Sequence, residues 1–91
     1  MSIQFKIPKL LQEKTDGAVL IAVQGGSVQE CIADLIRRYP GLKGMILDGE
    51  DGILLKWMVY INNKGTVSSN ELSYQVKDGD IITLLPMVAG G

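Results

Sequence analysis

Apolar and polar residues alternate along the first part of the chain. Ile3, Phe5 and Ile7 are separated by Gln4 and Lys6. A period of two puts successive side chains on opposite faces of a strand. The pattern therefore predicts an N-terminal strand with one buried face, ended by the proline that follows it.

A continuous apolar run covers residues 18–23, after a polar turn around residues 14–17. Short apolar runs bounded by turn residues are typical of strands. We interpret the run as the second strand of a hairpin. Two glycines, Gly25 and Gly26, mark its end.

The residues after these glycines predict a helix. Ser27 and Glu30 have the spacing of a capping box, in which two side chains satisfy exposed backbone donors at a helix start. Pro40 and Gly41 end the helix. Apolar residues follow at helical spacing and form one stripe: Val28, Ile32, Leu35, Ile36 and Tyr39.

The second half of the chain predicts two further strands. Residues 42–54 indicate a short helical turn followed by a solvated loop. A third strand is expected over 57–61, with a tight turn at 62–65. After a short crossing segment and a turn at 76–80, a final strand is expected over 81–85.

This order of elements predicts an α+β fold. The economical packing wraps a mixed sheet of about four to five strands on one main helix, which is a β-grasp (ubiquitin-like) arrangement. We expect a β-grasp domain over 1–86 and a C-terminal tail over 87–91. Strand alternation predicts the side chains that face the helix: Ile3, Phe5, Ile7, Trp57, Val59, Ile61, Ile82 and Leu84.

The opposite parity places apolar side chains on the outer face of the sheet. They are Met58, Tyr60, Ile81 and Leu85. Several apolar side chains gathered on one exposed face indicate a docking surface. The alternative is a set of scattered surface residues without a role, which occur on any protein.

Composition restricts the possible functions. A chain of 91 residues fits one small domain. Lys and Arg number 9 against 10 Asp and Glu, so there is no positive excess to attract nucleic acid or an anionic membrane. The apolar runs are too short to cross a bilayer, and we expect a cytoplasmic protein.

The reactive residue types also exclude common sites. The absence of histidine removes Ser-His and Cys-His nucleophile pairs and the usual zinc sites. The single cysteine, Cys31, lies beside the apolar stripe and is interpreted as a small buried thiol. No phosphate-binding loop follows Gly25 and Gly26, and the acidic residues 48–51 lack calcium-loop spacing. We expect no metal site and no cofactor on the chain itself.

The last residues form a thin tail. After Pro86 come Met87, Val88, Ala89, Gly90 and Gly91. Glycines can enter a narrow slot against another protein's backbone, and five extended residues reach roughly 17 Å. The tail therefore suits insertion into a partner's active site. The alternative is a frayed terminus without function.

A family resemblance favours the functional tail. The ending 85–91, after the turn Asp78-Gly79-Asp80, resembles that of the ubiquitin-like sulfur carriers of thiamin, molybdopterin and cysteine synthesis. Residues 60–63 and the opening strand also resemble this family. The length and the ending 88–91 are most similar to the cysteine-synthesis type.

The resemblance implies a carrier rather than an enzyme. In this family a ubiquitin-activating-type enzyme adenylates the terminal glycine carboxylate, here Gly91, with ATP that the partner consumes, and the adenylate becomes a thiocarboxylate. Gly90, Ala89, Val88 and Met87 are then the access tail. Leu85 corresponds to the apolar position pressed into the activating enzyme, and strand parity adds Met58 and Tyr60.

Further partners follow from the same resemblance. They are a sulfur-accepting enzyme, such as a cysteine synthase or the large subunit of molybdopterin synthase, and a metalloprotease that processes the tail. Two other functions stay open. One is a protein modifier that forms isopeptide bonds with lysines, and the other is a non-covalent ubiquitin-like interaction module with an inert tail.

Overall fold

The computed structural model describes residues 2–48, 52–53, 57–68 and 71–86. Its centre is a five-stranded mixed sheet with the strand order β2-β1-β7-β5-β6. The first and last strands, β1 and β7, are parallel and adjacent, and the other pairs are antiparallel. The strands are β1 (Ile3–Lys6), β2 (Leu20–Val23), β5 (Trp57–Ile61), β6 (Gly65–Val67) and β7 (Ile81–Pro86).

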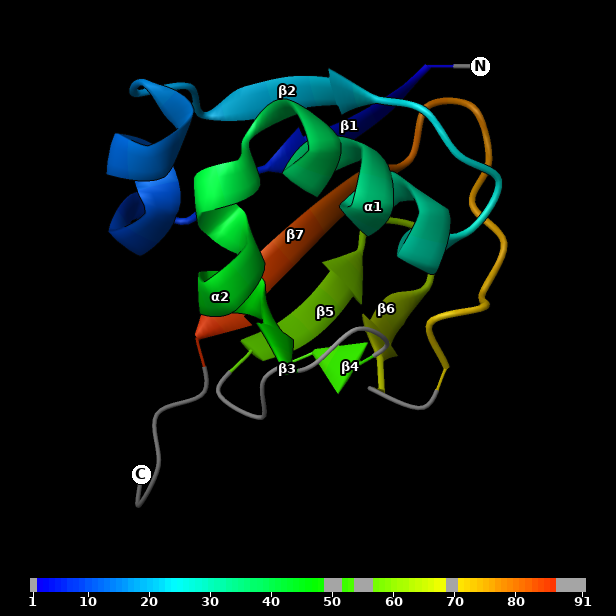
Figure 1. Ribbon diagram of the computed structural model, residues 1–91. Coiled ribbons are helices and arrows are strands. Elements are labelled where there is room, and N and C mark those ends of the chain that lie inside the picture. Colours follow the sequence, from blue (N-terminus) through cyan, green and yellow to red (C-terminus); the bar gives the residue numbers. More distant parts are fainter. Residues whose placement is uncertain (1, 49–51, 54–56, 69–70, 87–91) are drawn as a thin grey trace.

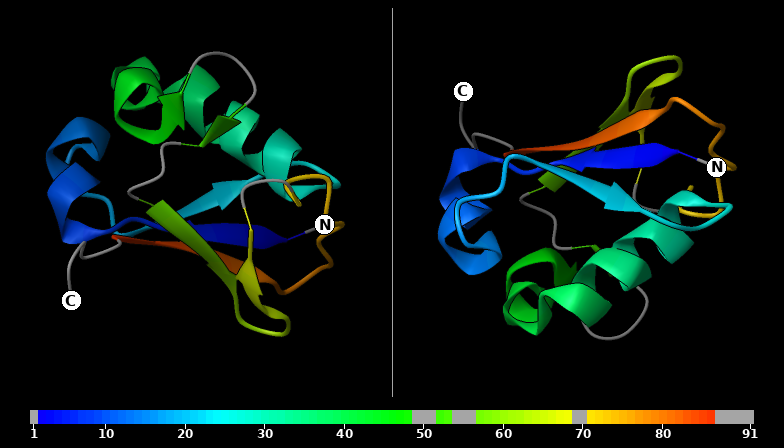
Figure 2. Two further views of the ribbon diagram at one scale, coloured as in Figure 1. Left: turned by 90° about the horizontal axis from the view of Figure 1, so that it is seen from below. Right: turned by 90° about the horizontal axis from the view of Figure 1, so that it is seen from above.

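Helices cover one face of this sheet (Figures 1 and 2). The long helix is α1 (Val28–Arg38), and a one-turn helix, α2 (Lys43–Ile46), follows it after the 3-10 turn η2 (Pro40–Leu42). The capping box expected at the start of α1 is present. The backbone N–H of Glu30 donates to Oγ of Ser27 at 3.2 Å, and Oε1 of Glu30 accepts from the N–H of Gly26 at 2.8 Å.

One hydrophobic core lies between α1 and the sheet. The sheet residues expected to face the helix are all buried, and they pack against Val28, Cys31, Ile32 and Leu35 of α1. This confirms the strand parity and the helix stripe. Tyr39 of that stripe caps the C-terminal end of α1, with its N–H donating to the carbonyl of Leu35 at 2.9 Å.

The predicted β-grasp fold is confirmed, and the structure adds elements that the sequence pattern did not predict. The 3-10 helix η1 (Lys9–Thr15) precedes the second strand, which begins at Leu20 rather than at residue 18. β6 pairs with β5 at the sheet edge. Part of the region interpreted as a solvated loop forms a small hairpin from β3 (Leu47–Asp48) and β4 (Gly52–Ile53).

The final strand extends one residue further than expected and includes Pro86. Proline is tolerated here because it is the last residue of the strand. Residues 87–91 lie outside the described part of the chain, so the division at residue 86 stays a prediction. In the described ranges, no helix combines the length and the apolar character needed to cross a bilayer.

Candidate functional site

The point where the tail begins lies at the end of an inner strand. β7 is flanked by β1 on one side and β5 on the other. Its last two residues, Leu85 and Pro86, are exposed and pair with Met58 and Trp57 of β5. The sheet therefore fixes the position from which residues 87–91 leave. Those five residues, including Gly90 and Gly91, lie outside the described residues.

A buried tryptophan supports this end of β7. Trp57, which pairs with Pro86, is buried, and its indole Nε1 donates a 2.7 Å hydrogen bond to the carbonyl of Met45 in α2. The bond satisfies the one polar atom of the indole side chain. It also ties α2 to the strand opposite the start of the tail.

The three residues predicted to bind a partner lie together on the outer face of the sheet. Met58 and Leu85 are cross-strand neighbours, and Tyr60 is two residues further along β5, opposite Thr83. The side chains of Tyr60 and Leu85 are 40% and 41% exposed, whereas Met58 is half-buried. Facing cross-strand pairs are in contact distance, so the three form one apolar surface beside the start of the tail.

Other exposed apolar residues were not among those expected. Leu10 on η1 is 62% exposed, and Val19 and Leu20 at the start of β2 are 46% and 51% exposed. Leu20 belongs to an entirely apolar run, which shows no alternation from which its outward direction can be predicted. The exposure of Leu10 follows from the 3-10 geometry of η1, for which the sequence gives no periodic signal.

Metal-ligand groups and the Cys31 thiol are the reactive groups to consider in the described ranges. Among these residues no three His, Cys, Asp or Glu side chains are grouped as metal ligands. Burial, with smaller contributions from the charges of Asp34 and Glu30, raises the pKa of the Cys31 thiol to about 11. A thiol with this pKa is a poor nucleophile near neutral pH. Cys31 is buried, as expected.

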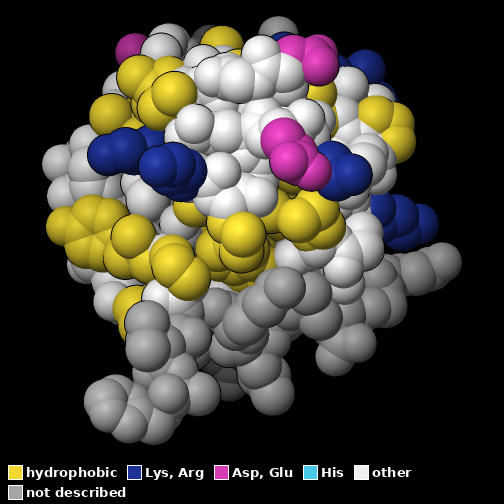
Figure 3. Space-filling view, turned by 90° about the vertical axis from the view of Figure 1, so that its left-hand side faces the viewer, with side chains coloured by type: hydrophobic (Ala, Val, Ile, Leu, Met, Phe, Trp, Pro, Cys, Tyr) yellow, Lys and Arg dark blue, Asp and Glu magenta, His cyan; other side chains and the backbone are white. Residues whose placement is uncertain are grey.

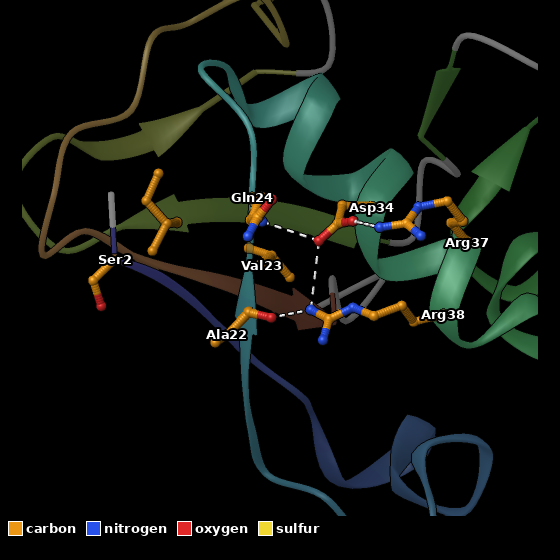
Figure 4. A pocket seen from close by; sticks show the side chains of 8 residues that line it. Ser2, Ala22, Val23, Gln24, Asp34, Arg37 and Arg38 are labelled. Atoms are coloured by element: carbon orange, nitrogen blue, oxygen red, sulfur yellow. Dashed lines mark hydrogen bonds and ion pairs between the residues drawn. The ribbon is translucent and has the colours of Figure 1, made fainter.

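A polar pocket of about 390 Å³ lies at the other end of the sheet, where β1 starts and β2 ends (Figure 4). Its charged side chains bind one another. Asp34 pairs with Arg37 and Arg38, and it accepts a hydrogen bond from the N–H of Gln24. Because β1 and β7 are parallel, the tail leaves from the opposite end. The pocket therefore has no part in the site at the tail.

Comparisons with known proteins identify the relatives of this chain. A model of the ThiS family matches residues 5–91. The sulfur carrier protein CysO of Mycobacterium tuberculosis is 31% identical over 93 residues, covering 100% of both chains. A chain in the crystal structure of the Amycolatopsis orientalis BexX/CysO complex superposes with a TM-score of 0.84 at 36% identity, covering 98% of this chain and 99% of that one.

A protein named as a modifier is also similar. The small archaeal modifier protein 1 of Methanosarcina acetivorans superposes with a TM-score of 0.81 at 26% identity, covering 99% of this chain and 96% of that one. These comparisons confirm the family resemblance of the sequence and the β-grasp fold.

Proposed function

This chain belongs to the ThiS family, and from that premise we propose that it is a sulfur carrier whose C-terminal Gly91 carboxylate is the loaded group. The observation that carries the proposal is the match to this family and to the carrier CysO, which runs to the end of the chain. The fixed strand end at Pro86, beside an exposed apolar surface, supports it. The sulfur would go to cysteine synthesis, as the similarity to CysO suggests.

The chemistry needs two steps at the Gly91 carboxyl group, the first at its oxygen and the second at its carbon. First, a carboxylate oxygen of Gly91 attacks the α-phosphorus of ATP, pyrophosphate leaves, and an acyl-adenylate forms. A hydrosulfide equivalent from a sulfur donor then attacks the acyl carbon, AMP leaves with the former carboxylate oxygen, and the thiocarboxylate remains after loss of a proton. Adenylation is required because a free carboxylate would have to expel oxide.

A partner enzyme would supply the catalytic groups. Stabilising the charge that develops on ATP and on the acyl carbon takes preorganised donors and a magnesium ion. The chain contributes the tail and a surface for docking, which we assign to Leu85, Met58 and Tyr60. The adenylating enzyme is of the ubiquitin-activating type, a biosynthetic enzyme accepts the sulfur, and a metalloprotease processes the tail.

A protein-modifier role is the second candidate. It is favoured by the similarity to the small archaeal modifier protein 1 of Methanosarcina acetivorans. In that case a lysine amine of another protein, rather than sulfur, attacks the Gly91 acyl carbon of the adenylate, AMP leaves, and an isopeptide bond remains after loss of a proton. Both roles share the adenylate, so they differ in the second nucleophile.

Pyrophosphate exchange tests the shared step. The full-length chain is mixed with the ubiquitin-activating-type enzyme of the same genome, and incorporation of labelled pyrophosphate into ATP is measured. We expect exchange with the complete chain and none after deletion of Gly91. Exchange that survives this deletion would refute the assignment of the loaded group.

Intact mass of the chain isolated from its host separates the two roles. One oxygen replaced by sulfur supports the carrier. Adducts on lysines of other proteins support the modifier. An unchanged mass together with no exchange leaves the non-covalent module and contradicts both proposals.

A further inference from the structure

The exposed apolar residues of the described chain gather at one end of the sheet. Of the large apolar side chains in these ranges, five are strongly exposed: Leu10, Val19, Leu20, Tyr60 and Leu85. Tyr60 and Leu85 already belong to the outer-face surface at the tail. We call the other three, Leu10, Val19 and Leu20, the η1–β2 patch.

The strand register connects this patch to the outer-face surface. Leu20 pairs with Lys6, Lys6 pairs with Thr83, and Thr83 pairs with Tyr60. All four residues have the parity of the outer face, since Phe5, Ile21, Ile61, Ile82 and Leu84 are buried on the other side. Leu20 and Tyr60 therefore lie in one row across the sheet, with Leu85 in the next row toward the tail.

η1 holds Leu10 at the same end of the molecule. The N–H of Leu11 donates to the carbonyl of Pro8 at 2.9 Å, and Oγ1 of Thr15 lies 3.0 Å from the carbonyl of Ala18. The side chains of Leu11 and Thr15 are buried. Leu10 directly precedes the buried Leu11, so its exposed side chain belongs to a helix that is anchored to the core.

The views agree on where this helix lies. η1 follows the end of β1, which runs parallel to β7, so η1 and the start of the tail are at the same end (Figures 1 and 2). From this side, hydrophobic side chains form a band across the molecule, and both basic and acidic side chains lie next to it (Figure 3).

The length of the tail decides what must face this end. Five residues follow Pro86, and five extended residues span at most roughly 17 Å. An enzyme that holds the Gly91 carboxylate in a closed site therefore has to bring the rim of that site against the end of the domain. The η1–β2 patch is part of that end.

Charge adds a second element of recognition. Lys6 is exposed within the row between Leu20 and Thr83, and Lys9 precedes Leu10. In the described ranges the ion pairs join Arg37 and Arg38 to Asp34, so neither lysine is engaged in one. An unpaired ammonium beside apolar side chains suits a carboxylate on the partner.

From these observations, and resting on the function proposed above, we propose that the η1–β2 patch docks on the adenylating enzyme that takes up the tail. The enzyme would present an apolar rim to Leu10 and Leu20, with a carboxylate opposite Lys6. The docking surface would then extend from Tyr60 and Leu85 across β1 and β2 to η1. The tail would place the reacting group, and this surface would hold the domain.

Pyrophosphate exchange with the same enzyme tests the patch when the concentration of the chain is varied. The double variant Leu10→Ser/Leu20→Ser should raise the KM for the chain by about tenfold or more, which corresponds to the loss of a strong interface contact. The kcat should stay within about twofold, since the tail is unchanged. Lys6→Glu should also raise KM, whereas Lys77→Glu, in the turn before the start of β7 and far from the tail, should not.

The outcomes separate this proposal from the one on which it rests. If the unaltered chain supports exchange but the KM is unchanged in the Leu10→Ser/Leu20→Ser and Lys6→Glu variants, the docking role of the η1–β2 patch is refuted. The carrier role then remains intact. No exchange by the unaltered chain would overturn the carrier role first. Thermal unfolding checks the fold of each variant, and if the double variant does not fold, the Lys6→Glu and Lys77→Glu pair decides.

Discussion

The backbone N–H of Gln24 donates a 3.0 Å hydrogen bond to Oδ2 of Asp34, which joins the end of β2 to the middle of α1. β2 is an edge strand of the sheet. Arg38, one turn further along α1, donates to the carbonyl of Ala22 and pairs with Asp34. The two side chains thus satisfy backbone groups on the free edge of β2 (Figure 4).

Removing the carboxylate should weaken the fold. Asp34→Ala breaks the bond to Gln24 and leaves Arg38 without its anion, so we expect a loss of about 1–2 kcal/mol in the free energy of unfolding. Urea denaturation measures this loss. Arg37→Ala is the matched control, because Arg37 also pairs with Asp34 but its side chain is 72% exposed. A pair exposed in this way contributes roughly 0–1 kcal/mol, and an equal loss in both variants would contradict a role for the strand contact.

The same carboxylate should make stability depend on pH. The hydrogen bond from the Gln24 N–H, followed by the Arg37 and Arg38 contacts, holds the pKa of Asp34 below its ordinary value of 3.8. A lowered folded-state pKa means that the stabilisation is complete above the unfolded-state pKa and is lost as pH falls through the folded-state pKa. Urea titrations of the unaltered chain and of Asp34→Asn should differ most at neutral pH and converge in acid. A constant difference across this range would show that the ionised form is not the stabilising one.

Gly25 should tolerate no side chain. A Cβ built there lies 2.8 Å from the backbone nitrogen of Cys31 and 2.8 Å from Cβ of Glu30, both in the first turn of α1. Gly25→Ala therefore requires the start of the helix to move, and we expect a loss of about 1–3 kcal/mol. Gly44 in α2 is the control, since a Cβ there meets nothing within 4 Å. Gly44→Ala should stabilise by about 0.5–1 kcal/mol, and similar unfolding curves for both variants would contradict the steric argument.

Neighbouring leucines on β7 should separate binding from folding. Leu85 is 41% exposed and Leu84 is 1% exposed. Leu85→Asp should raise the KM for the adenylating enzyme while its Tm changes little, because surface changes usually cost less than about 0.5 kcal/mol. Leu84→Asp puts a charge into the core and should prevent folding. A collapsed thermal transition for Leu85→Asp would show that this side chain supports the fold instead.

The sequence was sufficient for the elements that have a clear period. Alternation in β1, the apolar runs of β5 and β7 bounded by turn residues, and the capping box of α1 predicted these strands, the helix and the core. η1 and the start of β2 could not be predicted in the same way. In that region the residue types are compatible with a turn or a strand, and tertiary contacts of Leu11 and Thr15 decide the outcome.

In the candidate site, too, some features follow from the local sequence pattern and others depend on which strands pair. The outward directions of Tyr60 and Leu85 follow from strand parity. The extension of the apolar surface to Leu10 and Leu20 depends on which strands are neighbours, and the parallel pairing of β1 with β7 cannot be read from local patterns. The register of the sheet, and not the local sequence, places Lys6 and Thr83 in one row between Leu20 and Tyr60.

Cys31 should not carry sulfur. Its thiol is on the buried face of α1, within the hydrophobic core, and burial raises its pKa to about 11. Because the thiolate is the reactive form, native protein at pH 8 should react with iodoacetamide far more slowly than protein unfolded in urea. Intact mass measured over time in both conditions gives the two rates.

The variant Cys31→Ala tests the same point. It should leave adenylation and sulfur loading at Gly91 unchanged, and it should lose some stability because of the small cavity. Fast native alkylation would contradict the burial of this thiol, whereas loss of the carried sulfur in Cys31→Ala would contradict loading at the C-terminal carboxylate.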